Sequence, residues 1–192
     1  ENKFTIDSES GFLNARVFCI VVDNKKYNLE YVLGMMNSKI VQFYLHKTAP
    51  LKAGGFYGYA SKFLNAVPIP YSDESTQNKV IKNVKEAQKL KKRIQDQVEE
   101  FLDLLKTNLK IERTKRLSNF FELEFEELHE ELIKQKIEFK SIQIEANIRK
   151  FFMDSKTKTR KILLDLKKVE NEIEELSYSI YQLTDDEKLR MV

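Results

Sequence analysis

The clearest hydrophobic pattern lies in the C-terminal part of the chain. Its apolar residues are separated alternately by four and three positions: Ile162, Leu166, Val169, Ile173, Leu176, Ile180 and Leu183. Such heptads predict a helix with one narrow apolar stripe, as in a coiled coil. We expect this helix to span residues 141–183, with Ser141 as its N-cap, and to be about 65 Å long at 1.5 Å per residue.

A second apolar stripe, from Val80 to Leu109, predicts another long helix over residues 76–112. A helix with a single apolar stripe needs a partner, so we expect these two helices to pack antiparallel. Between them, residues 119–135 have the pattern of a short acidic amphipathic helix. The sequence from Thr184 to Glu187 is a capping-box pattern, which predicts a last short helix from residue 184.

The N-terminal part has a different pattern, because all five glycines and all three prolines lie within the first 70 residues. Glycine and proline are the strongest interruptions of regular structure. We therefore predict a small α/β unit over residues 1–72 and a helical region over residues 73–192. The expected fold class is α+β, mostly α, with the small unit followed by a long antiparallel, coiled-coil-like region.

Within the small unit, the β-branched run 17–22 predicts a buried strand, and Asn28 predicts the cap of a helix that reaches His46. The other expected elements are a strand at 3–6, a loop at 47–55, a strand at 56–59, a helical turn at 61–64 and an edge strand at 67–69.

Charge is distributed unevenly between these two parts. Residues 1–70 contain 8 Lys and Arg against 5 Asp and Glu, whereas residues 71–192 contain 25 of each. The net charge of +3 therefore belongs to the small unit. A hydrophobic fraction of 42% argues against disorder. No apolar run reaches the roughly 18–20 residues of a membrane span, so we expect no membrane partner.

The chain begins at Glu1 without a signal-peptide pattern, and we interpret it as part of a longer protein. Its single cysteine, Cys19, cannot form an internal disulfide, so a reducing cytoplasm is the default location. Because Cys19 lies within the predicted buried strand, we expect an inert, buried thiol.

Few residues are arranged for catalysis. His46 and His129 are 83 positions apart, with no cysteine or carboxylate at ligand spacing, so no metal site is predicted. No phosphate-binding or dinucleotide-binding glycine motif occurs. The glutamate pairs, including Glu174 and Glu175, are interpreted as solvated helix faces. We therefore expect no catalytic residue, metal or cofactor in this chain.

The segment 47–59 (KTAPLKAGGFYGY) is the best candidate for binding. Glycines allow close approach of the backbone to a ligand, lysines neutralise phosphates, and aromatic side chains stack on bases. Equally consistent with the residues alone is a solvent-exposed loop whose aromatic side chains fill the small core, with Phe56 and one tyrosine in that role.

Residues 79–116 are also basic, with 12 Lys and Arg against 6 Asp and Glu. Two interpretations remain open: electrostatic complementarity between the two long helices, or a basic surface along a nucleic-acid backbone. For residues 89–93 we favour complementarity, and for residues 113–116 the two are closer to equal.

Four segments resemble, in order, the TaqI-like C-terminal specificity domain: 31–39 (YVLGMMNSK), 43–44 (FY), 54–55 (GG) and 63–70 (FLNAVPIP). That domain is the target-recognition module of N6-adenine DNA methyltransferases and of type IIG restriction–modification enzymes. Residues 118–125 (SNFFELEF) and 174–187 (EELSYSIYQLTDDE) resemble the C-terminal part of type IIG enzymes. The glycine usual in the second segment is absent at Gln182, which predicts a longer helix with a weaker C-cap.

The resemblance implies a bacterial DNA-recognition module that acts in the cytoplasm. Its partners are double-stranded DNA and an upstream catalytic domain of the same polypeptide. S-adenosylmethionine and magnesium are expected only in that parent enzyme, a DNA adenine-N6 methyltransferase with or without endonuclease activity. This chain contains neither the Asn-Pro-Pro-Tyr type of motif nor a nuclease motif. We therefore expect it to bind DNA without methylating or cutting it.

We expect the small unit to contact duplex DNA, in the major groove, where all four base pairs are distinguishable. The candidate contacts are Lys47, Lys52 and Lys62 for phosphates or bases, Tyr57, Tyr59 and Ser61 for base edges or sugars, Gly54 and Gly55 for the loop, and secondarily Asn14 and Arg16. The motif residues Gly34, Asn37, Pro68 and Pro70 are expected to be structural.

Two alternative functions remain. The chain could be a fragment of a type I restriction specificity subunit, in which a similar recognition unit precedes a long spacer helix. It could also be a coiled-coil scaffold that binds protein. Salt separates DNA binding from the scaffold, because DNA affinity falls steeply between about 50 and 200 mM salt.

Overall fold

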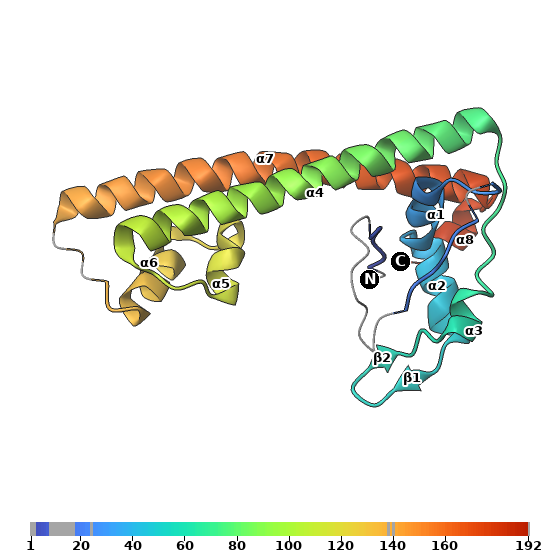
Figure 1. The fold of residues 1–192 in the computed structure, drawn as a ribbon, viewed down its shortest axis with the longest axis horizontal. Helices are drawn as coiled ribbons and strands as arrows, with labels where there is room; N and C mark the ends of the chain where they lie inside the picture. Colours follow the sequence, from blue (N-terminus) through green and yellow to red (C-terminus); the bar gives the residue numbers. More distant parts are fainter. Residues whose placement is uncertain (1–2, 8–17, 24, 138, 140, 192) are drawn as a thin grey trace. The chain divides into compact units, whose positions relative to one another are not determined.

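The computed structural model describes residues 3–7, 18–23, 25–137, 139 and 141–191 (Figure 1). They form two compact units, which we call unit 1 (Glu1–Ala87 with Val169–Val192) and unit 2 (Gln88–Lys168). The long helices α4 (Glu74–Leu109) and α7 (Ile142–Ile180) each contribute one end to each unit. The predicted class, mostly α within α+β, is confirmed. The predicted domain boundary after residue 72 stays a prediction.

Unit 1 begins with two short helices where the apolar spacing predicts one. These are α1 (Leu29–Met36) and α2 (Lys39–Thr48). The predicted N-cap is confirmed, because the Asn28 side chain accepts hydrogen bonds from two backbone N–H groups. The break follows from a second cap: Ser38 is extended and its hydroxyl accepts from the Val41 N–H at 3.3 Å. Serine at such a position favours a helix start over a helix interior.

The strands of unit 1 are shorter than predicted. Among the described residues, the only strands are β1 (Leu51–Lys52) and β2 (Phe56–Tyr57), which pair antiparallel. The predictions at 3–6 and 67–69 were wrong, as was that for residues 18–22 of the run 17–22, whose first residue lies outside the described part. Val21 is 90% exposed and Cys19 is also exposed, so the expected burial of this run and its thiol was wrong too.

Side-chain amides and hydroxyls bind the backbone where those strands were expected. The Asn37 amide oxygen accepts from the Phe4 N–H at 2.9 Å, and its amide nitrogen donates to the Phe4 carbonyl at 3.1 Å. Around 67–69, the carbonyls of Pro68 and Pro70 accept from tyrosine hydroxyls. Proline has no N–H for a strand ladder, so this segment is bonded through its carbonyls instead.

The core of unit 1 lies where α1 and α2 meet the long-helix ends. One apolar cluster consists of Met36, Val41, Leu45, Leu64 and Val67, and a second consists of Tyr31, Met35, Val80 and Val84. Gly34 lies at the crossing of α1 with α4, and a Cβ there would come within 2.9 Å of Val80 and 3.0 Å of Val84. This close approach of two helices explains the glycine in physical terms.

Two predicted short helices of unit 1 are confirmed. The first is α3 (Ser61–Leu64), which follows the hairpin. The second is α8 (Asp185–Leu189), whose capping box joins Thr184 and Glu187 in both directions.

The regular elements of unit 2 are all helices among its described residues. Besides its parts of α4 and α7, it contains α5 (Lys115–Ser118), the 3-10 helix η1 (Phe120–Glu122) and α6 (Phe125–Lys134). The single helix predicted at 119–135 is therefore two elements, divided where Leu123 and Glu124 become extended. Glu124 and Glu127 form a capping box there, so the acidic residues that suggested one helix in fact begin a new one.

Aromatic packing joins the helices of unit 2. The Phe101 ring of α4 stacks on Phe120 with centroids 3.9 Å apart and lies 5.3 Å from Phe151 of α7. Figure 1 shows that α4 and α7 run in opposite directions here, as predicted. The Ser141 hydroxyl accepts from the Ile144 N–H at 3.3 Å, which confirms the predicted cap of α7.

Candidate nucleic-acid interface

The candidate binding segment forms a hairpin that leaves the end of α2 (Figure 1). Leu51 pairs with Tyr57 and Lys52 with Phe56, and the turn between the strands contains Gly54 and Gly55. These glycines have φ of +89° and +79°, values that L-residues rarely adopt. The Gly55 N–H donates to the Lys52 carbonyl at 3.1 Å and closes the turn.

The two faces of the hairpin have different surroundings. Tyr57 stacks on His46 of α2, with ring centroids 4.0 Å apart, so its face is held against the helix. Lys52 and Phe56 are on the opposite face, because they oppose each other in the register. The Lys52 side chain lies across Gly58, where a Cβ would come within 2.6 Å of its Cε. Gly58 therefore leaves room for this lysine.

Phe56 was expected to fill the core, and that prediction was wrong. Its side chain is 74% exposed, and Leu51 is 65% exposed. Tyr59 fills the core instead, packing against the cluster around Leu45. Burial, and secondarily the neighbouring Tyr57, raise the pKa of Tyr59. Leu51 and Phe56 were not among the predicted contacts. Their exposure could have been expected, because a hairpin of two-residue strands has no second layer to cover both of its faces.

The three predicted phosphate-binding lysines are exposed and come from three consecutive elements. Lys47 is in the last turn of α2, Lys52 in β1 and Lys62 in α3. The Lys47 ammonium lies 5.3 Å from the centroid of Phe43, and that of Lys62 lies 4.8 Å from Phe63. Within the described part of the chain, none of the three forms an ion pair with a carboxylate.

The sequence around them contains no acidic residue at all. From residue 31 to residue 72 there are four lysines, at positions 39, 47, 52 and 62, and no Asp or Glu. The nearest carboxylates along the chain are Glu30 and Asp73, so the exposed lysines of the hairpin and α3 have no acidic neighbour in the sequence. Such a surface attracts a polyanion and repels a positively charged partner.

The remaining predicted contacts have mixed placements. Ser61 is exposed as the first residue of α3, next to Lys62. Asn14 and Arg16 lie outside the described residues, so they stay predictions.

The motif residues expected to be structural are hydrogen-bonded. The Tyr31 hydroxyl donates to the Pro70 carbonyl at 2.8 Å, and the Tyr181 hydroxyl donates to the Pro68 carbonyl at 2.7 Å. Burial raises the pKa of Tyr31 to about 12, with a smaller contribution from Tyr27, so its hydroxyl stays a donor. Both bonds fix the segment that follows α3 and hence the position of the candidate interface.

The basic residues at 113–116 contribute to the fold. Arg113 pairs with Glu99 at 2.8 Å, and Arg116 pairs with Glu127 at 2.8 Å and with Glu131 at 3.2 Å. These partners lie in α4 and α6, so the two arginines stabilise unit 2, while complementarity between the two long helices stays a prediction.

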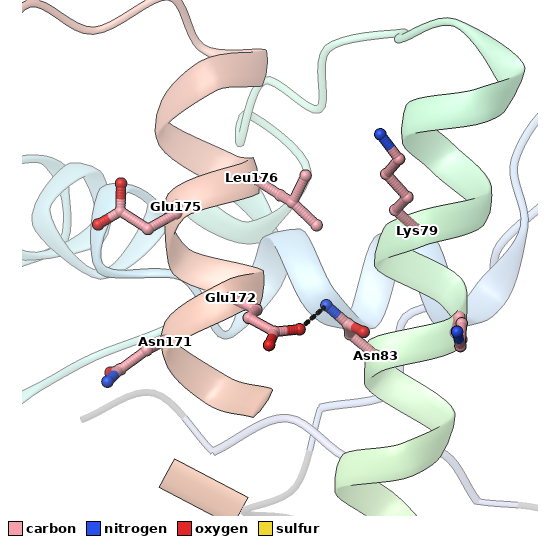
Figure 2. Close-up of a pocket in the computed structure, with 7 residues that line it drawn as sticks. Lys79, Asn83, Asn171, Glu172, Glu175 and Leu176 are labelled. Atoms are coloured by element: carbon pink, nitrogen blue, oxygen red, sulfur yellow. Dashed lines mark hydrogen bonds between the residues drawn. The ribbon is translucent and has the colours of Figure 1, made fainter. Parts of the chain in front are cut away.

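A groove in unit 1 lies between the first turns of α4 and the last turns of α7, with a volume of about 530 Å³ (Figure 2). Its wall includes Lys79, Lys82 and Glu175, and the Asn83 amide donates to Glu172 at 3.0 Å across it. Charges of both signs line the groove, and the described residues contain no group of three His, Cys, Asp or Glu that could hold a metal. No described helix is long and apolar enough to cross a bilayer.

Two family models match consecutive parts of the sequence. Residues 1–69 match the TaqI-like C-terminal specificity domain, and residues 73–176 match a domain of unknown function (DUF8810). No curated protein and no solved structure matches the chain. Since the second match covers more than half of the 192 residues, the chain belongs to the family of the domain of unknown function DUF8810, with a TaqI-like C-terminal specificity domain as its N-terminal part.

Proposed function

We propose that this chain is a sequence-specific DNA target-recognition module, in which the hairpin and α3 of unit 1 contact duplex DNA. The observation that supports it most strongly is the coincidence of two independent features. Residues 1–69 match a specificity domain, and the same segment has an acid-free stretch with three exposed lysines.

In the proposed mechanism, Lys47, Lys52 and Lys62 neutralise phosphates and set the position of the module on the duplex. Phosphate contacts of this kind give affinity but no sequence information. Sequence is recognised by groups that reach base edges in the major groove. Exposed side chains between or next to the three lysines include Thr48, Phe56 and Ser61, with Tyr57 partly accessible.

The parent protein in this proposal is a type IIG restriction–modification enzyme or a related adenine-N6 DNA methyltransferase of the bacterial cytoplasm. An upstream catalytic domain would bind S-adenosylmethionine and, for cleavage, magnesium. The resemblance of residues 174–187 to type IIG enzymes supports this assignment. Tyr181 of that segment donates a hydrogen bond to Pro68 of the specificity domain.

A charge-matched pair of variants tests the proposed contact. The hairpin triple is Lys47→Gln, Lys52→Gln and Lys62→Gln. The control triple is Lys106→Gln, Lys136→Gln and Lys150→Gln, three exposed lysines of unit 2 for which no ion pair is formed within the described residues. Both variants lose three positive charges, so a difference between them reports position and not net charge.

We expect the hairpin triple to bind a mixed-sequence duplex more weakly than the control triple at low salt, by fluorescence anisotropy. Each lost phosphate contact should also reduce the slope of log K against log salt by about 1. Equal affinities and slopes for the two triples would remove the hairpin from the mechanism. If neither the variants nor the wild type bind duplex DNA, the alternative function as a coiled-coil scaffold that binds protein remains.

A further inference from the structure

Unit 2 contains a second basic surface, on parts of α4 and α7 that are far from the hairpin in sequence. Residues 88–93 and 158–168 together contain nine Lys and Arg and one acidic residue, Asp165. All nine basic residues are exposed. Lys168 pairs with Asp165 at 3.6 Å, and Arg160 donates to the Phe121 carbonyl at 3.0 Å.

Six other cations form no ion pair within the described part of the chain. We call them the basic belt: Lys89, Lys92, Arg93, Lys158, Lys161 and Lys167. The three on α4 are spaced i, i+3 and i+4, and Lys158 and Lys161 are spaced i and i+3. These spacings place the three cations of α4 on one face of their helix, and Lys158 and Lys161 on one face of α7. Lys167, nine residues after Lys158, lies on the other side of α7.

The two groups lie at the same level of the helix pair. Phe101 of α4 contacts Phe151 of α7, and the helices run in opposite directions. Since both helices rise 1.5 Å per residue, position 90, eleven residues before Phe101, is level with position 162, eleven after Phe151. Leu90 and Ile162 are correspondingly buried, at 3% and 7% exposure. The belt thus surrounds a single short section of the pair.

Complementarity between the long helices does not explain the belt. Elsewhere in unit 2 the cations that serve the fold have carboxylate partners, as for Arg149 with Glu126 at 2.9 Å and the buried Lys156 with Glu124 at 2.9 Å. At the level of the belt both helices are basic, so neighbouring cations repel one another. The preference for complementarity at residues 89–93 stays a prediction, without an ion pair of Lys89, Lys92 or Arg93 among the described residues to support it.

We propose that the basic belt is a second DNA-binding surface, which contacts phosphates without sequence preference. On each helix the cations that share a face extend over about 5–6 Å, so each group reaches about two phosphates of one strand at 3.4 Å per phosphate. This inference rests on the proposed function, because the specificity domain makes DNA the polyanion available to the same chain. The belt supplies affinity and the hairpin supplies position and sequence.

The test uses a belt triple, Lys89→Gln, Lys92→Gln and Lys161→Gln, beside the hairpin and control triples. We expect the belt triple to weaken binding to every duplex by the same factor, about tenfold or more near 0.1 M salt, and to lower the salt slope by about 2–3. Its unfolding midpoint should equal or exceed that of wild type, because like charges are removed.

The three variants separate the two proposals. If only the hairpin triple is impaired, the belt inference is overturned and the proposed function stands. If only the belt triple is impaired, the belt stands as a DNA-binding surface and the hairpin mechanism fails. Belt-dependent binding to phosphatidylserine vesicles without belt-dependent binding to DNA would assign the belt to a lipid surface and overturn the inference.

Discussion

The resemblance of residues 174–187 to type IIG enzymes predicts glycine at the position of Gln182. Its φ is +55°, in the left-handed region. The Gln182 N–H donates to the Ser179 carbonyl at 3.1 Å, and the Leu183 N–H donates to the Tyr178 carbonyl at 3.0 Å. These two bonds are those of a Schellman motif. The motif ends α7 at Ile180, so the expectation of a longer helix at this position was wrong.

Because Gln182 has a left-handed backbone conformation, glycine at this position should stabilise the protein. We expect Gln182→Gly to raise the free energy of unfolding by about 1 kcal/mol, since the left-handed conformation costs a non-glycine residue about 1–2 kcal/mol and glycine loses more chain entropy on folding. Urea denaturation measures this difference. Gln182→Ala is the control and should not stabilise the protein. A Gly variant no more stable than the Ala variant would contradict a strained C-cap.

Glu174 was expected on a solvated helix face, and that prediction was wrong. The side chain is half-buried, and both carboxylate oxygens lie 3.1 Å from the Lys39 backbone nitrogen. It therefore accepts from the first N–H of α2 and supplements the Ser38 cap. Burial, as the larger effect, raises the pKa of Glu174, while the bond from the Lys39 N–H opposes this rise.

The raised pKa of Glu174 determines the direction in which its contribution to stability changes with pH. The contribution of Glu174 is fully present below the unfolded pKa of about 4.5 and is lost as the pH rises through the raised folded value. Gln keeps an acceptor oxygen and never ionises. We therefore expect Glu174→Gln to gain stability relative to wild type between pH 4 and 7, measured by urea denaturation. Glu175→Gln, at an exposed position, is the control, and a relative loss of stability over that range would contradict the account.

At the scale of elements, tyrosine hydroxyls fix the segment between α3 and α4. Tyr31 of α1 and Tyr181, just after α7, hold the Pro70 and Pro68 carbonyls, respectively. This segment joins the candidate interface to the first long helix. Residues that lie 113 positions apart in sequence thus determine where α3 is held.

We expect Tyr181→Phe to lower the free energy of unfolding by about 0.5–1.5 kcal/mol, the usual net value of one hydrogen bond. Tyr71→Phe is the matched control, because the Tyr71 side chain is 77% exposed. Thermal and urea denaturation measure both variants. If Tyr181→Phe were as stable as the control, the bond to Pro68 would not contribute to the position of the segment.

Periodic segments could be predicted from the sequence to within three residues at each end. The predicted helices 76–112 and 141–183 correspond to Glu74–Leu109 and Ile142–Ile180. The break between α1 and α2 could not be predicted, because the apolar spacing continues through it. In addition, Asn37 at the break binds the backbone of Phe4, which is distant in the sequence. The strand prediction at 18–22 was wrong because β-branched composition does not show whether another segment of the chain pairs with the run.

For the candidate site, the sequence indicated the glycine turn and the three lysines, which the structure places on exposed, consecutive elements. It could not indicate that Phe56 points away from the core and Tyr59 into it, because both fit the same short strand. The sequence also could not show which cations form ion pairs. Arg116 and Lys92 lie in the same basic segment, but the fold places carboxylates beside Arg116 only.

At the scale of the whole molecule, a net charge of +3 conceals a strong separation of charge. The hairpin region of unit 1 and the basic belt of unit 2 are positive, whereas residues 122–131 contain six glutamates and no Lys or Arg. Five of these glutamates, at positions 124, 126, 127, 130 and 131, pair with cations of unit 2. Binding to DNA is therefore expected to depend on where the positive charge lies more than on its total.

The most direct test of sequence recognition is selection of duplexes from a randomised library by the wild-type chain, followed by sequencing. The account predicts enrichment of one defined target, which the hairpin triple no longer selects and which the belt triple still selects at lower yield. A bound pool with the same sequence composition as the starting library, at a salt concentration where wild type binds, would contradict the central claim that this module recognises a DNA sequence.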